Sequence, residues 1–449
     1  MKCKIKNFNL NYKWDIDKDS YFNIDFDYGK YSKTNRDSLP NAYYSDFNKE
    51  QIFSQRDYQI DTQTDIDIVT GKIDYERPFL SGKLGLGTKY ASIKTDNTFE
   101  FYRYLGNAAV LDVNQSNLFN YRENVFAFYT NYNGSYKKLS YQAGLRLEHT
   151  NSRGELKTFN NQEEPVTKRS YLDFFPSVSF SYPVNEKNNL QLSYTRRINR
   201  PEYQDLNPFL SQLDELNFEV GNEKLRPEYT NNIQLRHSFN NFLNTTLAYS
   251  RTNNGISRVV QISEDNRGML LTKRNLGYQD HISANIAAPI TINKWWSTYT
   301  SLTGFYMHNV GDFGNEGSID VSVTSYNIYN QQSFKLPADF SFELSGWYSS
   351  PSVWAGNFKT NAMWAMDAGI QKRFLDDRAK LKISCSDLFR TIRWSGSSEF
   401  GAMAMLGNGG HDSRRVKVSF SYTFGNTNVK SRNRNTGIED ENSRIKSGN

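Results

Sequence analysis

Apolar and polar side chains alternate along this chain with a period of two residues. In the segment RRVKVSFSYTFGN, residues 414–426, every second residue from Val416 to Phe424 is large and apolar, and the residues between them are Lys, Ser or Thr. Successive side chains of a β-strand point to opposite faces, so this pattern predicts a strand with one apolar and one polar face. A soluble protein turns such a face toward a core, whereas an outer-membrane barrel turns it toward lipid.

The same alternation recurs along the chain, and almost no helical periodicity of comparable length interrupts it. It is clear in the segments 8–16, 22–28, 139–147, 178–182, 190–194, 233–239, 282–288, 340–348 and 364–370. The chain is therefore predicted to be all-β.

Composition favours the membrane alternative. Aromatic residues make up 15% of the 449 residues, but all hydrophobic residues together reach only 37%. No apolar run approaches the ~18 residues that a spanning helix needs. A transmembrane barrel has this composition, because only alternate strand residues meet lipid while the lumen and loops are polar.

The lengths of the connections support the same conclusion. Short turns such as DKDS (17–20), NGSYKK (133–138), PVNEKNN (183–189) and LDDRAK (375–380) alternate with long polar stretches at 33–57, 96–120, 151–168 and 200–228. Bacterial outer-membrane barrels have short periplasmic turns and long extracellular loops. We therefore predict a large antiparallel transmembrane β-barrel over residues 1–425, with the long loops outside the cell.

The strand count has a further consequence. About seventeen strands are visible, a count whose strand boundaries are approximate, and both the first and the last lead toward the short-turn side. Bacterial single-chain barrels have even strand numbers and the largest plugged transporters have about 22. The N-terminal stretch MKCKIKNFNLNYKWDID has no secretory signal pattern. We expect a C-terminal fragment of a barrel of about 22 strands, without signal peptide or plug domain.

The most specific stretches are RRINRPEYQDLNPFL (196–210) and GNEKLRPEYTNN (221–232). They resemble the C-terminal half of TonB-dependent outer-membrane receptors, and in particular the outer membrane protein beta-barrel family common in Bacteroidetes. The chain departs from that pattern at Glu223, where Pro is usual, and at Arg226, where Lys is usual. The SDLF motif at 386–389 and the aromatic last strand also resemble the family. The resemblance covers nearly the whole chain, but only the barrel.

The resemblance implies a transporter of the Gram-negative outer membrane. Such a barrel is inserted into outer-membrane lipid by the barrel-assembly machinery. It binds a ligand on its extracellular side and takes it up with energy from a TonB-like periplasmic protein, contacted through the region before this chain. Siderophore, glycan, peptide and cobalamin-like ligands all remain open. Two alternatives are a surface-binding or adhesin barrel without transport and a barrel-embedded hydrolase.

Substrate-binding candidates lie at the first of these stretches. Pro201 fixes the backbone and removes a donor where a strand leaves the sheet. Two roles stay open for Arg197, Arg200 and Tyr203, which either brace the loop or contact the ligand directly. Separately, the polar-face residues Arg146, Glu148, Arg197 and Lys417 are expected to form a charged lumen wall.

Other chemistry is not indicated. The chain has no nucleophile-elbow, zinc-protease or phosphate-loop motif, and its five histidines are scattered. We predict no enzyme activity, no metal site and no cofactor. Positive and negative residues are interspersed at a net charge of +6, without a basic block, so nucleic-acid binding is not expected. The polar tail 426–449 is predicted to be disordered and periplasmic.

Overall fold

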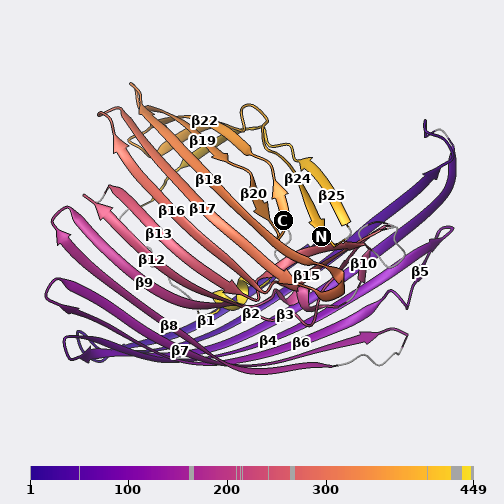
Figure 1. Cartoon of the computed structure of the whole chain (residues 1–449), viewed down its shortest axis with the longest axis horizontal. Helices are drawn as coiled ribbons and strands as arrows, with labels where there is room; N and C mark the ends of the chain where they lie inside the picture. Colours follow the sequence, from indigo (N-terminus) through magenta and orange to yellow (C-terminus); the bar gives the residue numbers. More distant parts are fainter. Residues whose placement is uncertain are drawn as a thin grey trace.

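A computed structural model describes residues 2–49, 51–160, 166–208, 210–212, 214, 216–240, 242–262, 268–401, 403–425 and 437–445. Its main element is one antiparallel sheet whose long strands follow one another in chain order along a curved wall (Figure 1). The long strands are β1 (Lys2–Asp15), β2 (Tyr21–Tyr44), β3 (Ile52–Phe79), β4 (Gly82–Leu105), β6 (Asn117–Tyr136), β7 (Leu139–Thr158), β8 (Thr167–Asn185), β9 (Asn188–Asn199), β12 (Glu228–Phe239), β13 (Leu243–Asn253), β16 (Tyr278–Thr291), β17 (Trp296–Asp312), β18 (Ser318–Lys335), β19 (Phe340–Ser349), β22 (Met363–Phe374), β23 (Ala379–Ser386) and β26 (Arg415–Tyr422). The short β5 (Ala108–Leu111) pairs with β4 as an eighteenth strand.

The seventeen long strands of the described residues confirm the count made from the alternation. Each is antiparallel to its neighbour, so β1 and β26 run in the same direction. Within the described residues β1 pairs only with β2, and β26 pairs only with β23. The sheet is therefore open between these two strands.

The two faces of the sheet have opposite polarity. On the convex face the predicted apolar rows are exposed, as at Leu10 (62%) in β1 and Phe420 (65%) in β26. On the concave face, which we call the lumen, polar residues such as Asp27 and Thr70 are buried. This inverts the pattern of a soluble protein and matches a wall that meets lipid outside and polar groups inside. The prediction that the apolar rows point outward is confirmed.

Turns and long connections lie on opposite ends of the strands, as the sequence predicted. The short-turn end has the tight connections 16–20, 80–81, 137–138, 186–187, 240–242, 292–295, 336–339 and 375–378. The predicted extent of the long loops, however, is wrong. Residues 33–57 are mostly strand, because β2 continues to Tyr44 and β3 begins at Ile52. Beyond the hydrocarbon both faces of a strand can be polar, so the ladder continues where the alternation stops.

Within the described residues, two smaller sheets are built from the long connections, and we call them the loop sheets. The first contains β10 (Leu210–Gln212), β11 (Asn217–Val220), β15 (Met269–Asn275) and β14 (Ile256–Ile262). The second contains β20 (Ser352–Trp354), β21 (Phe358–Thr360), β24 (Arg393–Phe400) and β25 (Met403–Gly410). The helical turns are η1 (Tyr203–Leu206), η2 (Gly314–Glu316) and α1 (Glu439–Asn442). No helix in the described ranges is long and apolar enough to cross a membrane.

The predicted disorder of the tail is wrong for residues 437–445. This part contains α1, and both Ile438 (4% exposed) and Arg444 (9% exposed) are buried. The composition suggested disorder because the segment is short and polar, but its charged side chains find partners on the lumenal wall. Residues 426–436 and 446–449 lie outside the described residues.

Candidate ligand sites in the lumen and the loop sheets

The corner segment, which is the described part of residues 200–227 between β9 and β12, packs against the inner face of the wall. Its η1 turn buries Tyr203 (0% exposed) and Leu206 (5%), and Leu225 is also fully buried. These side chains join a cluster with Ile66, Ile68, Ala91, Ile93, Phe119, Tyr121 and Val125 from the inner faces of β3, β4 and β6. Apolar contacts thus anchor this connection to the wall.

Polar contacts fix the same segment from the other side. The guanidinium of Arg169 in β8 donates to the carbonyl oxygens of Glu223 and Leu225. The amide of Asn222 donates to the carbonyl of Asp205 at 2.7 Å. A Cβ at Gly221 would lie 2.1 Å from the Asn207 carbonyl oxygen, so only glycine permits this close approach. The departure from the family pattern at Glu223 is compatible with this geometry, because the contact uses the backbone of that residue.

Arg200 is held in a buried group of charges on the lumenal wall. Its Nη2 donates to Glu148 Oε2 at 2.6 Å and to Thr150 Oγ1 at 3.0 Å. Arg146 Nε donates to the other oxygen of the same carboxylate at 2.5 Å. The side chain of Arg200 is 13% exposed and that of Glu148 is 6% exposed. Glu148 therefore accepts hydrogen bonds from both Arg146 and Arg200, which confirms the charged lumen wall at Arg146 and Glu148.

A cavity of about 450 Å³ lies next to this group. Its lining includes Arg197, which is exposed, and Arg200. Tyr203 does not line the cavity, because it is buried beneath the guanidinium of Arg444, 4.2 Å from the centre of its ring. Lys417 also lies elsewhere, on the open-edge strand β26. The structure therefore brings Arg197 and Arg200 to one cavity and places Tyr203 in its support.

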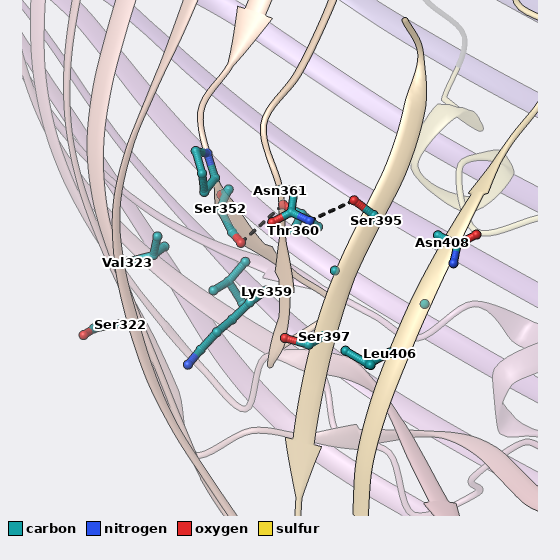
Figure 2. Close-up of a pocket in the computed structure, with 14 residues that line it drawn as sticks. Ser322, Val323, Ser352, Lys359, Thr360, Asn361, Ser395, Ser397, Leu406 and Asn408 are labelled. Atoms are coloured by element: carbon teal, nitrogen blue, oxygen red, sulfur yellow. Dashed lines mark hydrogen bonds between the residues drawn. The ribbon is translucent and has the colours of Figure 1, made fainter.

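A second cavity, of about 460 Å³, lies against the second loop sheet (Figure 2). It is lined by Ser322, Val323, Pro351, Ser352, Val353, Lys359, Thr360, Asn361, Ser395, Gly396, Ser397, Leu406, Gly407 and Asn408. Asn361 Nδ2 donates to Ser395 Oγ at 2.8 Å, and Thr360 Oγ1 donates to the Ser352 carbonyl at 3.2 Å. Hydroxyl and amide groups thus converge with the exposed ammonium of Lys359, a combination suited to a polar ligand.

Sequence reasoning missed this second cavity. Its residues come from β18 and from two separate connections, 350–362 and 387–414, with β22 and β23 between them in the chain. They are mostly Ser, Gly, Thr and Asn, which the sequence presents as ordinary loop composition. Only the pairing of β21 with β24 brings them together.

The SDLF motif forms a turn that supports this loop sheet. Asp387 has no exposed surface and accepts bonds from the amides of Thr391 (2.9 Å) and Ile392 (3.0 Å) and from the hydroxyl of Ser413 (2.5 Å). Burial alone would raise the pKa of this carboxyl, but these hydrogen bonds together hold its pKa well below the usual range. The ionised carboxylate therefore ties the start of β24 to the segment that leads into β26.

Neither cavity presents a recognisable metal centre. Across the described ranges, no group of three or more His, Cys, Asp or Glu side chains could hold a metal ion.

A curved wall of long antiparallel strands, apolar outside and polar inside, with folded loops on one end only, defines an outer-membrane β-barrel protein. The comparison with family models agrees. The model described as "Outer membrane protein beta-barrel family" matches residues 14–422, and the chain belongs to this family. No curated protein matches the sequence.

Solved structures with a similar fold include several outer-membrane transporters and receptors. The chain superposes on the copper transporter OprC with a TM-score of 0.63 at 12% identity, covering 94% of this chain and 72% of OprC. It superposes on the ferric yersiniabactin uptake receptor FyuA from Yersinia pestis with a TM-score of 0.63 at 11% identity, covering 94% of this chain and 61% of FyuA. On the closed form of the ferric-catecholate import receptor Fiu from E. coli K12 it superposes with a TM-score of 0.64 at 14% identity, covering 94% of this chain and 64% of Fiu. The chain spans less than two thirds of FyuA and Fiu, and at these identities the likeness concerns the fold.

Proposed function

We propose that this chain forms the wall of an outer-membrane receptor that takes up a ligand too large for porins. The observation that carries the proposal is the combination of a cavity in a folded loop sheet with a polar, charged lumen on the same wall. A barrel that only binds a surface partner needs the first but not the second. Similar folds in proteins named as transporters and uptake receptors support the proposal.

Each of the two cavities would serve a different step of uptake. The second loop sheet, with Lys359 and its hydroxyl and amide groups, makes the first contact with the ligand. The lumenal wall, with Arg197 and Arg200, then offers polar contacts along the path. No covalent step is involved, so the protein is proposed to be a receptor and not an enzyme. Energy would come from a TonB-like periplasmic partner.

Membrane insertion sets further requirements. The exposed apolar rows would lie against outer-membrane lipid after insertion by the barrel-assembly machinery. In the part of the chain that the structure describes, the outer edges of β1 and β26 have no strand partner, and each unpaired backbone group costs several kcal/mol in hydrocarbon. We therefore propose that further strands pair with these edges, to give the even strand number of bacterial barrels. Five strands would complete a barrel of about 22.

Energised uptake is the experiment that tests the proposal. A deletion strain, and the same strain complemented with the gene, would be given labelled ferric siderophores, oligosaccharides, peptides and cobalamin, with and without a protonophore. We expect one class to accumulate only in the complemented strain, and only without protonophore. Ser397→Tyr, which fills the loop-sheet cavity, should abolish accumulation, and Ser45→Tyr, on the exposed connection between β2 and β3, should not.

Other outcomes would contradict the proposal. Binding that depends on the protein but is unaffected by the protonophore, without entry, would support the surface-binding or adhesin alternative. Conversion of a ligand outside the cell would support a barrel-embedded hydrolase.

A further inference from the structure

The C-terminal residues Gly437–Ile445, which we call the docked segment, lie inside the curve of the main sheet. In Figure 1 they form the yellow helical turn near the middle of the molecule. They contact side chains of β2, β4 and β6 and the corner segment, which are 238 to 410 residues earlier in the chain. None of the residues proposed to contact the ligand lies on this segment, so its position needs a separate explanation.

Apolar contacts hold both ends of the docked segment. Ile438 is 4% exposed and belongs to the cluster that anchors the corner segment, and Ile445 packs against the same cluster. Gly29 in β2 leaves room for the first of these, because a Cβ there would lie 2.8 Å from Ile438 Cδ1. Ile438 and Ile445 are the large aliphatic residues of the described tail, and both pack against this cluster.

Two buried charges of the wall find their counter-charges on the docked segment. Lys89 (5% exposed) places its Nζ 2.9 and 3.0 Å from the two carboxylate oxygens of Glu441. Glu123 (2% exposed) accepts two bonds from the guanidinium of Arg444, through Nη1 and, at 3.2 Å, through Nη2. A buried charge without a partner is strongly unfavourable. The wall thus carries one cation and one anion that the segment neutralises.

The spacing of these partners is specific. Glu441 and Arg444 are three residues apart, which places them on one side of a helical turn. Arg444 also donates from Nε to the Pro201 carbonyl at 3.1 Å and lies over the ring of Tyr203 at 4.2 Å, a favourable cation–π distance. The amide of Gly437 donates to Asp27 Oδ2 at 2.9 Å. The docked segment thus makes backbone hydrogen bonds, ion pairs and apolar contacts with the wall and the corner segment.

We propose that the inner faces of β2, β4 and β6, with the corner segment, form a peptide-binding site whose occupant is the protein's own docked segment. The site recognises an Ile-x-x-Glu-x-x-Arg pattern. The docked segment also forms one side of the 450 Å³ cavity that holds Arg197 and Arg200, so its release changes the shape and charge of the lumen. This inference needs only the barrel and does not rest on the uptake function.

Thiol labelling of the full-length protein tests the proposal. Cys3 and Cys385, the two free cysteines, are replaced by Ser, and a single cysteine is introduced at Ile438 or at Ser443, which is exposed on the same segment. We expect N-ethylmaleimide to label Ile438→Cys at least about tenfold more slowly than Ser443→Cys, because labelling the buried position requires local opening. Equal rates would overturn the proposal and would indicate that the wall site has another occupant.

A charge reversal tests the recognition itself. Lys89→Glu should raise the labelling rate of Ile438→Cys toward that of Ser443→Cys, and the added change Glu441→Lys should restore protection. The matched control is Lys157→Glu in β7, which alters an exposed ion pair with Glu155 at 3.2 Å and should leave the rate unchanged. The heat-modifiable mobility of each variant confirms that the barrel is folded. A folded Lys89→Glu variant that stays protected, or one that Glu441→Lys does not restore, would overturn the proposal.

Discussion

Replacement of Leu235 by Arg should destabilise the protein in lipid far more than the same change at the neighbouring Gln234. Leu235 is on the convex face of β12, 41% exposed, and its register partners Leu192 and Leu247 are exposed on either side at 47% and 51%. An arginine at this position would meet lipid and apolar side chains, with no carboxylate opposite it. Gln234 points to the lumen, as does Arg236 two residues later in the same strand.

The magnitude follows from the depth of Leu235 in the membrane. It lies four residues before Phe239, the last residue of β12. A rise of about 3.4 Å per residue and a tilt of about 40° put it roughly 10 Å from that end. In an apolar band about 25 Å tall this position is near the midplane, where an arginine costs ~2–4 kcal/mol. For Gln234→Arg we expect less than ~1 kcal/mol, because the lumen is polar.

The measurement is urea unfolding of the protein refolded into lipid vesicles, followed by the fluorescence of its seven tryptophans. The change in the free energy of unfolding is taken from the shift of the midpoint at constant slope. Equal losses in the two variants, or a larger loss at Gln234, would mean that the convex face of β12 does not meet lipid.

Two further predictions concern the site. Arg200→Ala should lower the free energy of unfolding by about 2–3 kcal/mol, because Glu148 loses a charge-assisted hydrogen bond. Arg197→Ala should cost less than ~1 kcal/mol, and equal effects in a urea titration would contradict a stabilising role of the Arg200–Glu148 contact. Asp387 has a pKa that is lower in the folded protein than its unfolded value of about 3.9, so its stabilisation is complete above pH ~5 and is lost as the pH falls toward the folded pKa. The difference in melting temperature between the parent and Asp387→Asn should therefore be constant from pH 7 to 5 and shrink below pH ~4, and a difference independent of pH would show that the carboxylate does not hold the turn.

The sequence predicted the part of the fold that repeats a simple physical rule. Lipid outside and polar groups inside impose an alternation on every spanning strand, so segments such as 139–147 and 233–239 were recognisable individually. The tight turns were recognisable for a similar reason, because they break the alternation with Asn, Asp, Lys and Gly. The rule stops at the edge of the hydrocarbon, and for this reason β2 and β3 were predicted to end too early.

The sites depend on contacts between distant parts of the chain, which no local pattern contains. Tyr203 was a reasonable ligand candidate from its motif, but its burial is caused by apolar residues of β3, β4 and β6 and by Arg444 near the other end of the chain. The docked segment was missed because Glu441 and Arg444 look like solvated charges until Lys89 and Glu123 are placed opposite them. One signal was available in the tail, where Ile438 and Ile445 are seven residues apart, a spacing that puts both on one side of a helix.

The loop sheets are expected outside the cell and the short turns in the periplasm, and cysteine labelling on intact cells distinguishes this orientation from its reverse. With Cys3 and Cys385 replaced by Ser, one cysteine is placed at Leu406, which is 88% exposed in the second loop sheet, or at Lys187, in the short turn between β8 and β9. A membrane-impermeant maleimide should label Leu406→Cys on intact cells and Lys187→Cys only after the outer membrane is opened. Labelling of Lys187→Cys on intact cells, with Leu406→Cys protected, would show that the wall has the opposite orientation.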